Sequence, residues 1–491
     1  MVLLTMRGIL YMQTSRKIIS RTVKTVIFLI ITFFLWVLVR DTLVMKREDG
    51  ITSMKIFYEQ PEDTIDVLFT GSSHACYNIA AEELYEQYGI SFYQLWGSSQ
   101  PFWSTYYFIE EALKTQNPEV IVLDCYGASL RDDYSDKARQ ATNTLGLKLG
   151  MNQIQNIQVS APKDRWMELF LGLPIYHDRF SELLKGDFEF YPWSRTYVNI
   201  KGGEPVYGSN IVVNTTQILP KESIPLTEKQ EKWLRKIIQL CKDKKVELLL
   251  VVTPTALRKD EQGYYNSVAE IAEETDTPFL NMNELDKETG IRSEDYSYDD
   301  SHLNQNGARK TASYLGAYLK DHYELPDHRN DPAYAGWEEY KTNKLHQYLR
   351  IIMGASDYFN EIARENYAAV VVKTGDWDGM DPVLLDSLKN VGISNDLCTE
   401  LGNRIYLISD GEARQIKGED QTFSLFNGST ITISFSDQKF VIEDQYSYTW
   451  HKSGLIVAVY DMKQNIWLDA VLMPSDNSFY IERLNRHEND S

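Results

Sequence analysis

An uncharged apolar run near the N-terminus constrains this chain more than any other feature. The run TVIFLIITFFLWVLV covers residues 25–39 and carries no charged side chain. As a helix it spans about 22 Å, and extension through Met45 brings it to the ~30 Å of a bilayer core. Arg40 and Asp41 then lie near the far interface, where an arginine can extend its head group into water. We therefore expect a transmembrane anchor over residues 25–45.

The charges that flank this run predict its orientation. Arg16, Lys17, Arg21 and Lys24 precede it. This bias predicts that residues 1–24 are cytoplasmic and that the bulk of the chain is extracellular. A cleaved signal peptide is the alternative, but no small-x-small cleavage site follows the run, which favours an uncleaved anchor. A buried helix of a soluble protein is disfavoured because the run has no polar face.

Length and composition leave room for a large folded part. The 491 residues suffice for two or three domains, and 43% of them are hydrophobic. The net charge of −20 argues against a nucleic-acid surface. Four scattered cysteines without a CxxC pair (Cys76, Cys125, Cys241 and Cys398) predict neither a disulfide framework nor a cysteine zinc site. No bond between Cys76 and Cys125 can be inferred from the sequence.

Apolar runs that suit buried strands alternate with helical stretches after a charged connector at 46–62. The runs are 66–71, 92–97, 119–126, 246–255 and 278–283. The helix over 227–243 is marked by a capping box of Thr227 and Gln230. This order predicts a three-layer α/β/α domain with a parallel sheet over residues 63–323. An aromatic-rich insertion at 127–223 breaks the alternation, and either a lid over the substrate or extra packing on one flank explains it.

The remainder of the chain has a different pattern. Residues 324–365 are polar and helical, and we interpret them as a bridge. Residues 366–485 hold several strand-like runs with turn residues between them and one helix at 380–393. We expect a separate, β-rich sandwich domain there.

The turn after the first predicted strand has the composition of a catalytic site. Gly71, Ser72 and Ser73 follow it in the stretch VLFTGSSHACYNI. Ligands bind at the carboxyl ends of parallel strands, and glycine permits a tight turn there. A serine in this place is near a helix N-terminus, which favours developing negative charge. The alternative is that the serine only caps the helix.

A base and an acid for this serine occur late in the same predicted domain. His302 follows Asp299 by three residues, just before a helix. A turn of this spacing can hold the carboxylate against one ring nitrogen while the other nitrogen faces the serine. Asp300 is an alternative acid, but the three-residue spacing favours Asp299.

The blocks GSSH and DDSHLNQNG resemble those of the SGNH (GDSL-like) hydrolase superfamily, and the resemblance covers about residues 61–323. It implies that Ser73 is the nucleophile, His302 the general base and Asp299 its orienting acid. The block FYQLWGSSQ looks like the second block of the family. By this likeness, the N–H groups of Gly97 and Ser73 form the oxyanion hole.

Two positions depart from the family pattern. Ser72 stands where the family has aspartate, and the Gly-x-Asn-Asp block has no match, since LDCYGAS follows the third strand instead. A third oxyanion donor is therefore unassigned.

Such Gly-Ser-Ser variants resemble the membrane-anchored branch that includes the D-alanyl lipoteichoic acid transfer protein and the alginate O-acetyltransferases. The likeness implies acyl chemistry on a surface polysaccharide or teichoic acid, with a membrane-bound O-acyltransferase as a partner. Hydrolysis and transfer both stay open, as does a non-catalytic glycan-binding protein that keeps the fold.

Several other polar and aromatic residues are candidates for substrate contacts, each with a structural alternative. His74 either touches substrate or caps the helix and faces solvent, and His177 either lines the cleft or is a surface histidine. Trp103, Trp193 and Tyr207 suit sugar stacking, although most aromatic side chains belong to the core. No clustered His and carboxylate ligands occur, so no metal or cofactor is expected.

The last domain has a resemblance of its own. The segments NYAAVVVKTGDWDG, NRIYLISDG and SGLIVAVYDMKQNIWLDAVLMP resemble the interleukin-like EMT-inducer domain over about residues 366–475. That likeness implies a small β-sandwich that binds carbohydrate, while a purely structural appendage is the alternative.

Overall fold

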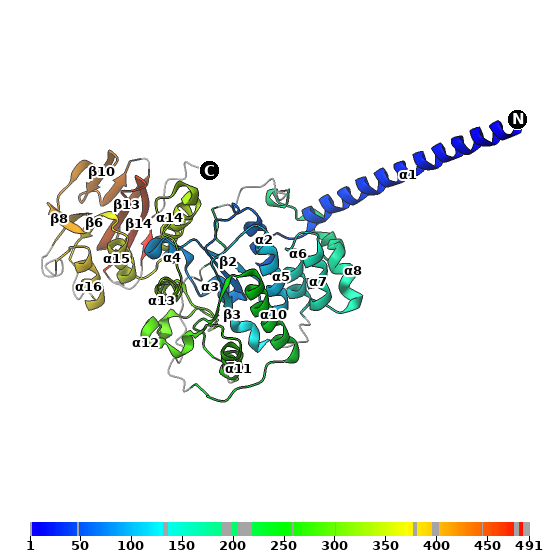
Figure 1. Cartoon of the computed structure of the whole chain (residues 1–491). Coiled ribbons are helices and arrows are strands. Elements are labelled where there is room, and N and C mark those ends of the chain that lie inside the picture. Colours follow the sequence, from blue (N-terminus) through cyan, green and yellow to red (C-terminus); the bar gives the residue numbers. More distant parts are fainter. Residues whose placement is uncertain are drawn as a thin grey trace. The chain divides into compact units, whose positions relative to one another are not determined.

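The computed structural model describes residues 2–46, 49–130, 136–188, 199–204, 206, 219–257, 260–299, 301–376, 381–394, 402–443, 445–475 and 481–484, with side chains from residue 18 onward. The chain divides into two compact units, Met1–Lys341 and Thr342–Ser491 (Figure 1). The division falls inside the segment predicted as a helical bridge, within helix α14 (Ala335–Leu349).

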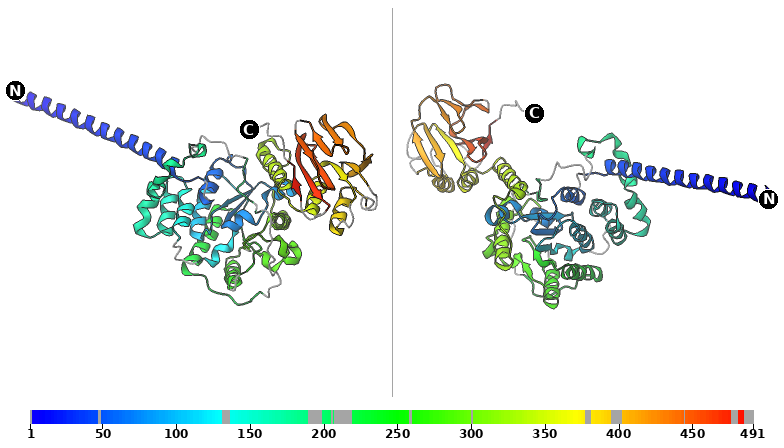
Figure 2. Two further views of the ribbon diagram at one scale, coloured as in Figure 1. Left: turned by 180° about the vertical axis from the view of Figure 1, so that it is seen from behind. Right: turned by 45° about the horizontal axis from the view of Figure 1, so that its top comes forward.

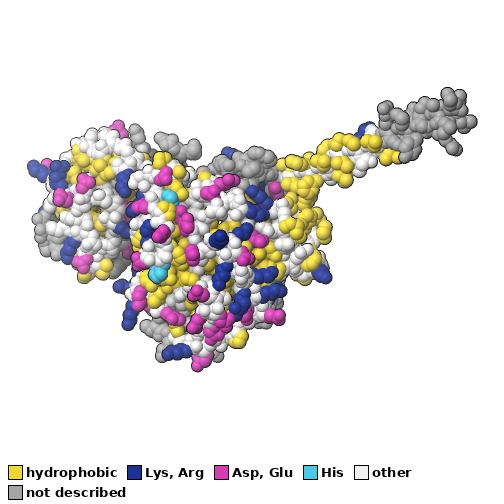
Figure 3. All heavy atoms as spheres, in the orientation of Figure 1, with side chains coloured by type: hydrophobic (Ala, Val, Ile, Leu, Met, Phe, Trp, Pro, Cys, Tyr) yellow, Lys and Arg dark blue, Asp and Glu magenta, His cyan; other side chains and the backbone are white. Residues whose placement is uncertain are grey.

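The N-terminal helix is long and apolar enough to cross a membrane. Helix α1 covers Val2–Leu43, and its part Ile18–Leu43 reaches a mean hydropathy of 2.4 over a stretch that is not buried in the fold. From residue 18 onward, most of the side chains on this helix are hydrophobic and exposed (Figure 3). The predicted apolar helix is confirmed, and its membrane insertion and orientation are taken up below.

A five-stranded parallel sheet forms the centre of the first unit. Its strands are β1 (Val67–Gly71), β2 (Phe92–Trp96), β3 (Val120–Asp124), β4 (Glu247–Val252) and β5 (Phe279–Asn281), in the order β2-β1-β3-β4-β5. Every pair is parallel. The five strands coincide with the five predicted runs, which confirms the α/β fold class.

Two apolar cores lie on opposite faces of this sheet, because successive side chains of a strand point to opposite faces. Leu68 contributes to the core beneath α5 (Phe102–Ala112), α10 (Glu228–Lys244) and α11 (Glu261–Glu274). Val67 and Phe69 contribute to the core beneath α4 (Ala81–Tyr88) and α13 (Gln305–His322). Helix, sheet and helix thus form the three layers that the sequence predicts.

The capped helix of the prediction begins where expected. The hydroxyl of Thr227 accepts a hydrogen bond from the N–H of Gln230 at 3.2 Å, at the start of α10. Cys76, Cys125 and Cys241 are buried free thiols, so Cys76 and Cys125 are not bonded, and Cys398 lies outside the described residues.

The segment interpreted as a connector is a packed helix for most of its length. Helix α2 covers Asp49–Tyr58, and the side chains of Met54 and Phe57 belong to the core of the first unit. Apolar residues at helical spacing, rather than the flanking charges, decide its structure. The sequence interpretation overlooked this short amphipathic pattern.

The described part of the insertion packs on one flank of the sheet. It consists of α6 (Lys137–Leu145), α7 (Met151–Ser160), α8 (Trp166–Leu171) and α9 (Leu173–Tyr176). Helix α6 packs on α2, and α7 packs on α5. These helices fit the flank-packing alternative, while residues 131–135, 189–198 and 207–218 lie outside the described part.

The second unit is the β-rich region that the sequence predicts. A six-stranded antiparallel sheet has the order β15-β14-β13-β6-β7-β8, and a four-stranded one has the order β12-β11-β10-β9. One apolar core contains residues of both, such as Val370 and Ile456 from the first and Ile431 and Phe440 from the second, so the two sheets form a sandwich (Figure 2). The strands are β6 (Ala368–Thr374), β7 (Arg404–Ser409), β8 (Glu412–Ile416), β9 (Gln421–Leu425), β10 (Ser429–Ser434), β11 (Lys439–Ile442), β12 (Tyr446–Thr449), β13 (Gly454–Asp461), β14 (Ile466–Pro474) and β15 (Glu482–Arg483), with helices α15 (Ala355–Arg364) and α16 (Pro382–Asn390).

A buried lysine in the first unit makes stability depend on pH. Lys201 is 1% exposed, its Nζ donates to Gln60 Oε1 at 2.8 Å, and it lies 3.6 Å from the ring centre of Trp337. Burial lowers the pKa of Lys201 to about 7. An unfolded lysine titrates near ~10.4. Between these values the unfolded state binds more protons, so stability rises with pH.

We predict that Lys201→Met removes this pH dependence. Below pH 7 the wild type bears the full cost of a buried charge, and the variant gains most there. The gain shrinks as pH rises from 7 to about 10. Calorimetric unfolding midpoints at several pH values measure it, with the exposed Lys287→Met as control. Parallel pH curves for the wild type and Lys201→Met contradict the prediction.

Candidate active site

The turn after β1 needs glycine because it lies against β3. Gly71 has φ +146°, and a Cβ built on it comes within 2.7 Å of Asp124 Cβ. A side chain is excluded there by both space and backbone conformation. Ser72 then caps helix α3 (Ser73–Tyr77), accepting from the N–H of His74 at 3.2 Å, and Ser73 is the first residue of that helix. The capping alternative therefore applies to Ser72, and Ser73 is the serine left for chemistry.

A buried carboxylate that the sequence interpretation did not single out holds Ser72. Oδ2 of Asp124 accepts from the backbone N–H of Ser72 at 3.0 Å and also from its hydroxyl. Oδ1 accepts from the N–H of Tyr126 at 3.2 Å. Asp124 is the last residue of β3 and is 1% exposed. A carboxylate therefore lies beside position 72, where the resembled family has its own aspartate. Here Asp124, at the end of the neighbouring strand β3, supplies it.

Burial and hydrogen bonding change the pKa of the Asp124 carboxyl in opposite directions. Burial raises the pKa of Asp124, and the two hydrogen bonds from Ser72 act against that rise without cancelling it. An ionised Asp124 therefore carries a desolvation cost in the folded protein. A costly charge that fixes the turn before Ser73 is typical of functional sites.

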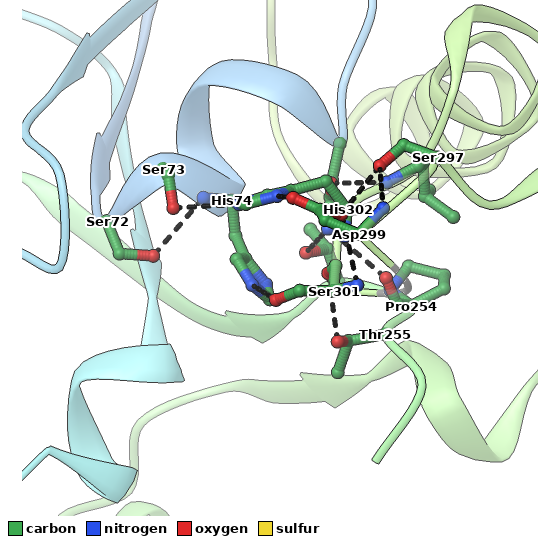
Figure 4. Close-up of polar contacts among 12 residues, drawn as sticks. Ser72, Ser73, His74, Pro254, Thr255, Ser297, Asp299, Ser301 and His302 are labelled. Atoms are coloured by element: carbon green, nitrogen blue, oxygen red, sulfur yellow. Dashed lines mark hydrogen bonds and ion pairs between the residues drawn. The ribbon is translucent and has the colours of Figure 1, made fainter. Parts of the chain in front are cut away.

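The structure brings Ser73, His302 and Asp299 together in one hydrogen-bonded chain (Figure 4). His302 Nε2 lies 2.8 Å from Ser73 Oγ, and His302 Nδ1 lies 2.6 Å from Asp299 Oδ2. Ser73 comes from the start of α3, while the other two come from the loop before α13. With Nδ1–H donating to the carboxylate, Nε2 is left as the acceptor for the serine hydroxyl proton.

Asp299 is held as an anion by its neighbours. Its Oδ1 accepts from the Ser297 hydroxyl at 2.6 Å and from the His302 N–H at 3.1 Å. Burial raises the pKa of Asp299, but the hydrogen bonds from Ser297 and His302 outweigh burial and lower it to about 2. The carboxylate is therefore charged at neutral pH. Asp300, the alternative acid, lies outside the described residues.

Two buried contacts fix the histidine loop to the rest of the site. Asn78, which caps the C-terminus of α3, accepts from the N–H of Leu303 at 2.9 Å and donates to Thr253 Oγ1 at 2.9 Å. The hydroxyl of Thr255 donates to the carbonyl of Ser301 at 3.0 Å. Asn78 thus connects the helix that begins with Ser73 to the residue after His302. Nothing in the pattern around Asn78 distinguishes it from an ordinary helix-terminal asparagine.

Two aromatic rings, those of His74 and Tyr77, lie edge-on against the His302 imidazole. His74 stacks on Tyr126 at 4.2 Å and meets His302 edge-on at 5.0 Å, and Tyr77 meets His302 edge-on at 4.9 Å. His74 is only 1% exposed, and its Nε2 lies 3.4 Å from Ser301 Oγ. The alternative that His74 faces solvent is therefore wrong, because its ring is a wall of the site. Its contact with substrate stays a prediction.

Gly97 lies at the same sheet edge, but its N–H already makes a backbone hydrogen bond. It donates to the carbonyl of Gly71 at 3.1 Å, as an extension of the β1–β2 ladder. A Cβ on Gly97 would come within 2.0 Å of Asn143 Oδ1, so a side chain at this position would displace Asn143. The N–H of Gly97 is thus not free to act as the expected oxyanion donor in this conformation, because it is hydrogen-bonded to the carbonyl of Gly71.

His177 and Trp103, which the sequence suggested as substrate contacts, have no described contact with the candidate site. His177 is exposed, at the start of a 3-10 turn (His177–Ser181) that packs on α1, and its Nδ1 is 3.2 Å from the carbonyl of Pro174. Its proposed place in the cleft has no support among the described contacts. Trp103 is fully buried and donates to Ser160 Oγ at 3.1 Å, so it is a core residue. Trp193 and Tyr207 lie outside the described residues.

Comparisons with known proteins give only distant likenesses. No family model and no curated protein matches the chain. An acylhydrolase from Bacteroides fragilis is similar in structure at 9% identity over 53% of this chain and 90% of its own, with a TM-score of 0.26. The acetylxylan esterase Axe2 of Geobacillus stearothermophilus is similar at 15% identity over 54% of this chain and 97% of its own, with a TM-score of 0.27. Likenesses of this degree do not identify an activity, which depends on the residues at the site.

We predict that Asp124→Asn slows the reaction of Ser73 without loosening the fold. Ser72 donates to one oxygen of Asp124 and the N–H of Tyr126 donates to the other, so in either orientation the amide presents its N–H₂ group to a donor, and the turn that carries Ser73 shifts. A shift of this kind costs about 10- to 100-fold in rate. The unfolding midpoint is expected to stay or rise at pH values where the carboxylate is charged, because the raised pKa of Asp124 means that the charged form destabilises the folded state.

Labelling of Ser73 by a fluorophosphonate measures the rate, and calorimetry measures the stability. The exposed Asp243→Asn serves as control. An unchanged labelling rate, or a slow rate that only follows a loss of folded protein, contradicts a positioning role for Asp124.

Proposed function

We propose that this protein is a serine-dependent esterase or O-acyltransferase. The observation that carries the proposal is the continuous hydrogen-bonded chain from Asp299 through His302 to Ser73 Oγ. Three residue types in this order and geometry activate a hydroxyl as a nucleophile. The blocks that contain them resemble those of the SGNH hydrolases, which supports acyl chemistry as the reaction class.

The geometry suggests how each group acts on an ester. Ser73 Oγ attacks the acyl carbonyl carbon while its proton passes to His302 Nε2, and Asp299 stabilises the imidazolium that forms. The tetrahedral intermediate then expels the alcohol, which takes the proton from Nε2, and an acyl-Ser73 ester remains. Water, or a hydroxyl of an acceptor, attacks that ester with His302 again as base. The first acceptor gives hydrolysis and the second gives acyl transfer.

Two backbone N–H groups, those of Ser73 and Gly97, are the candidate oxyanion donors. Ser73 is the first residue of its helix, and the first N–H groups of a helix lack intrahelical acceptors, which makes its N–H the primary donor. Gly97 becomes a second donor only if its bond to Gly71 is given up. Each missing donor costs about 10²–10³ in rate. We therefore expect slow turnover of simple esters.

The cellular setting belongs to the same proposal. The apolar helix α1 and the basic residues before it support a single-pass anchor with the folded units outside the cell. The resemblance to the envelope acyl-transfer branch supports a surface polysaccharide or teichoic acid as the acyl donor or acceptor, and a membrane-bound O-acyltransferase as partner. The β-sandwich of residues 366–485 is proposed as a carbohydrate-binding module because its segments resemble the interleukin-like EMT-inducer domain.

The Ser73→Ala variant is expected to abolish the reaction. Loss of the nucleophile lowers turnover of a chromogenic acetyl ester by about 10³-fold or more. His302→Ala is expected to give a similar loss, because the two residues act as one unit. The full chain in detergent micelles is assayed, and the exposed Ser181→Ala is the matched control.

Two further measurements separate the alternatives. Mass spectrometry of the wild type after a short incubation with an acetylated glycan is expected to find the acetyl group on Ser73. If Ser73→Ala turns over the ester as fast as the control, the enzymatic proposal is wrong. Glycan binding without turnover in every variant then favours the non-catalytic, glycan-binding alternative.

A further inference from the structure

The helix pair α8 and α9 packs alongside the C-terminal end of the apolar helix α1. The ring of Phe170 in α8 lies 5.8 Å from the ring of Trp36 in α1, centre to centre. A Cβ built on Gly172, between α8 and α9, would lie 3.2 Å from Arg40 Nε. Arg40 is only 4% exposed. The expectation that its side chain reaches water at the interface is therefore wrong, because the folded unit covers it.

This packing contact lies within the length that α1 needs to cross a bilayer. Lys24 is the last basic residue before the apolar run, and it marks the cytoplasmic boundary of the span. From Lys24 a helix rises about 18 Å to Trp36 and about 29 Å to Leu43. A hydrocarbon core is ~30 Å thick. With α1 inserted as proposed, Trp36 lies inside the bilayer, and the part of α8 that packs on it lies at the outer boundary of the hydrocarbon.

Polar contacts fix the next segment, residues 177–188, to the same end of α1. Arg179 Nη1 donates to the carbonyl of Leu43 at 2.6 Å, and its Nη2 donates to both carboxylate oxygens of Asp187 at 3.1 Å. Lys46, just beyond α1, donates to the carbonyl of Asp187. Arg179 and Asp187 are both buried. Breaking a buried ion pair is strongly destabilising, so this pair holds the segment at the level of Leu43.

Large hydrophobic side chains of these elements are exposed. Phe180 is 73% exposed and Met167 is 62% exposed, and Leu184 and Phe188 are exposed as well. We call these four side chains the apolar rim. Single exposed hydrophobic residues are common on any protein, but these four occur in one short stretch, 167–188. Figure 3 shows hydrophobic side chains that continue from α1 onto the adjoining part of the folded unit.

Continuity with α1 favours the lipid bilayer as the partner of this surface. Helix α9 and the 3-10 turns His177–Ser181 and Lys185–Phe188 all pack on α1. Exposed charges of both signs, on Asp178, Glu182 and Lys185, lie in the same segment. Neither sign prevails, so apolar burial rather than head-group charge accounts for the contact.

We propose that the apolar rim lies in the outer interface of the membrane and holds the folded unit against it. Phe180 and Met167 enter the boundary between head groups and acyl chains, while the neighbouring charged side chains stay in water. The inference rests on the membrane insertion of α1 and not on the triad. A single helix leaves the folded unit free to tilt, whereas a second contact beside it keeps one face of the unit toward the bilayer.

Spin labelling of the full chain in phosphatidylcholine bilayers tests the proposal. A nitroxide is attached in turn to Phe180→Cys, Met167→Cys and Lys287→Cys, and its accessibility to oxygen and to a water-soluble nickel chelate gives its depth. The labels at 180 and 167 are expected about 5–10 Å into the boundary of head groups and acyl chains. The label at the exposed position 287, on α12 (Asp286–Thr289) well away from α1 in Figure 1, is expected in water. Wild type treated in the same way gives the background from the native cysteines.

A further label at Phe34→Cys, near the middle of the span, separates this proposal from the anchor on which it rests. If the label at 34 is in the bilayer while those at 180 and 167 are open to the nickel chelate, the rim proposal is wrong and the anchor stands. If the label at 34 is also open to the chelate, the insertion of α1 is wrong and the rim proposal fails with it. If the labels at 180 and 167 are closed to both reagents and broaden one another as protein density rises, a second copy of the chain covers the rim, and the membrane contact is wrong.

A charged variant tests whether the rim itself maintains the contact. In the background Phe180→Asp with Leu184→Asp, the label at 167 is expected to move outward into water, because charged side chains are excluded from the acyl region. Lys185→Asp makes the same change in net charge without removing an apolar side chain, and it is expected to leave the depth at 167 unchanged. Calorimetric unfolding midpoints show that both variants are folded. An unchanged depth at 167 in the folded double variant overturns the proposal.

Discussion

The close approach of β1 to β3 at their carboxyl ends determines the geometry of the whole site. Position 71 requires glycine because its φ is +146° and because a Cβ there would collide with Asp124. This close approach brings the Asp124 carboxylate to the N–H and hydroxyl of Ser72. Ser72 in turn caps α3, so the direction of that helix is fixed at its first turn. Ser73 follows with its Oγ toward His302. A buried carboxylate, which is costly to ionise, thus determines the position of Ser73.

His302 and Asp299 come from the other end of the domain, and polar contacts hold their loop beside Ser73. Because β1 and β4 both pair parallel with β3, their carboxyl ends lie on the same edge of the sheet. Asn78 at the end of α3 and Thr255 beyond β4 both bind the loop that carries His302. The position of the imidazole therefore depends on contacts from outside its loop as well as on Asp299 within it. Such support by surrounding groups is what holds a catalytic group within tenths of an ångström.

The sequence allows the strands, and the contact of Ser73 with His302 and Asp299, to be predicted, and it does so for local reasons. Buried parallel strands are continuous apolar runs, and Asp299 and His302 lie in a short turn whose spacing is informative. The failures all involve contacts between distant residues. Asp124 looks like the end of any strand, and the N–H of Gly97 looks free until the ladder bond to Gly71 is seen. Arg40 looks like an interfacial arginine until Gly172 is in place beside it.

The bond between Gly97 and Gly71 decides how strong an oxyanion hole this site can have. A ladder hydrogen bond contributes about 0.5–1.5 kcal/mol net, and leaving the buried Gly71 carbonyl without a donor costs about 1–3 kcal/mol. An oxyanion donor contributes about 2.7–4 kcal/mol in the transition state. The gain and the loss are nearly equal unless water replaces the lost donor at Gly71. The N–H of Ser73, which needs no such exchange, is therefore the donor on which the proposed chemistry chiefly relies, and Gly97 strengthens the hole only where substrate binding also admits that water.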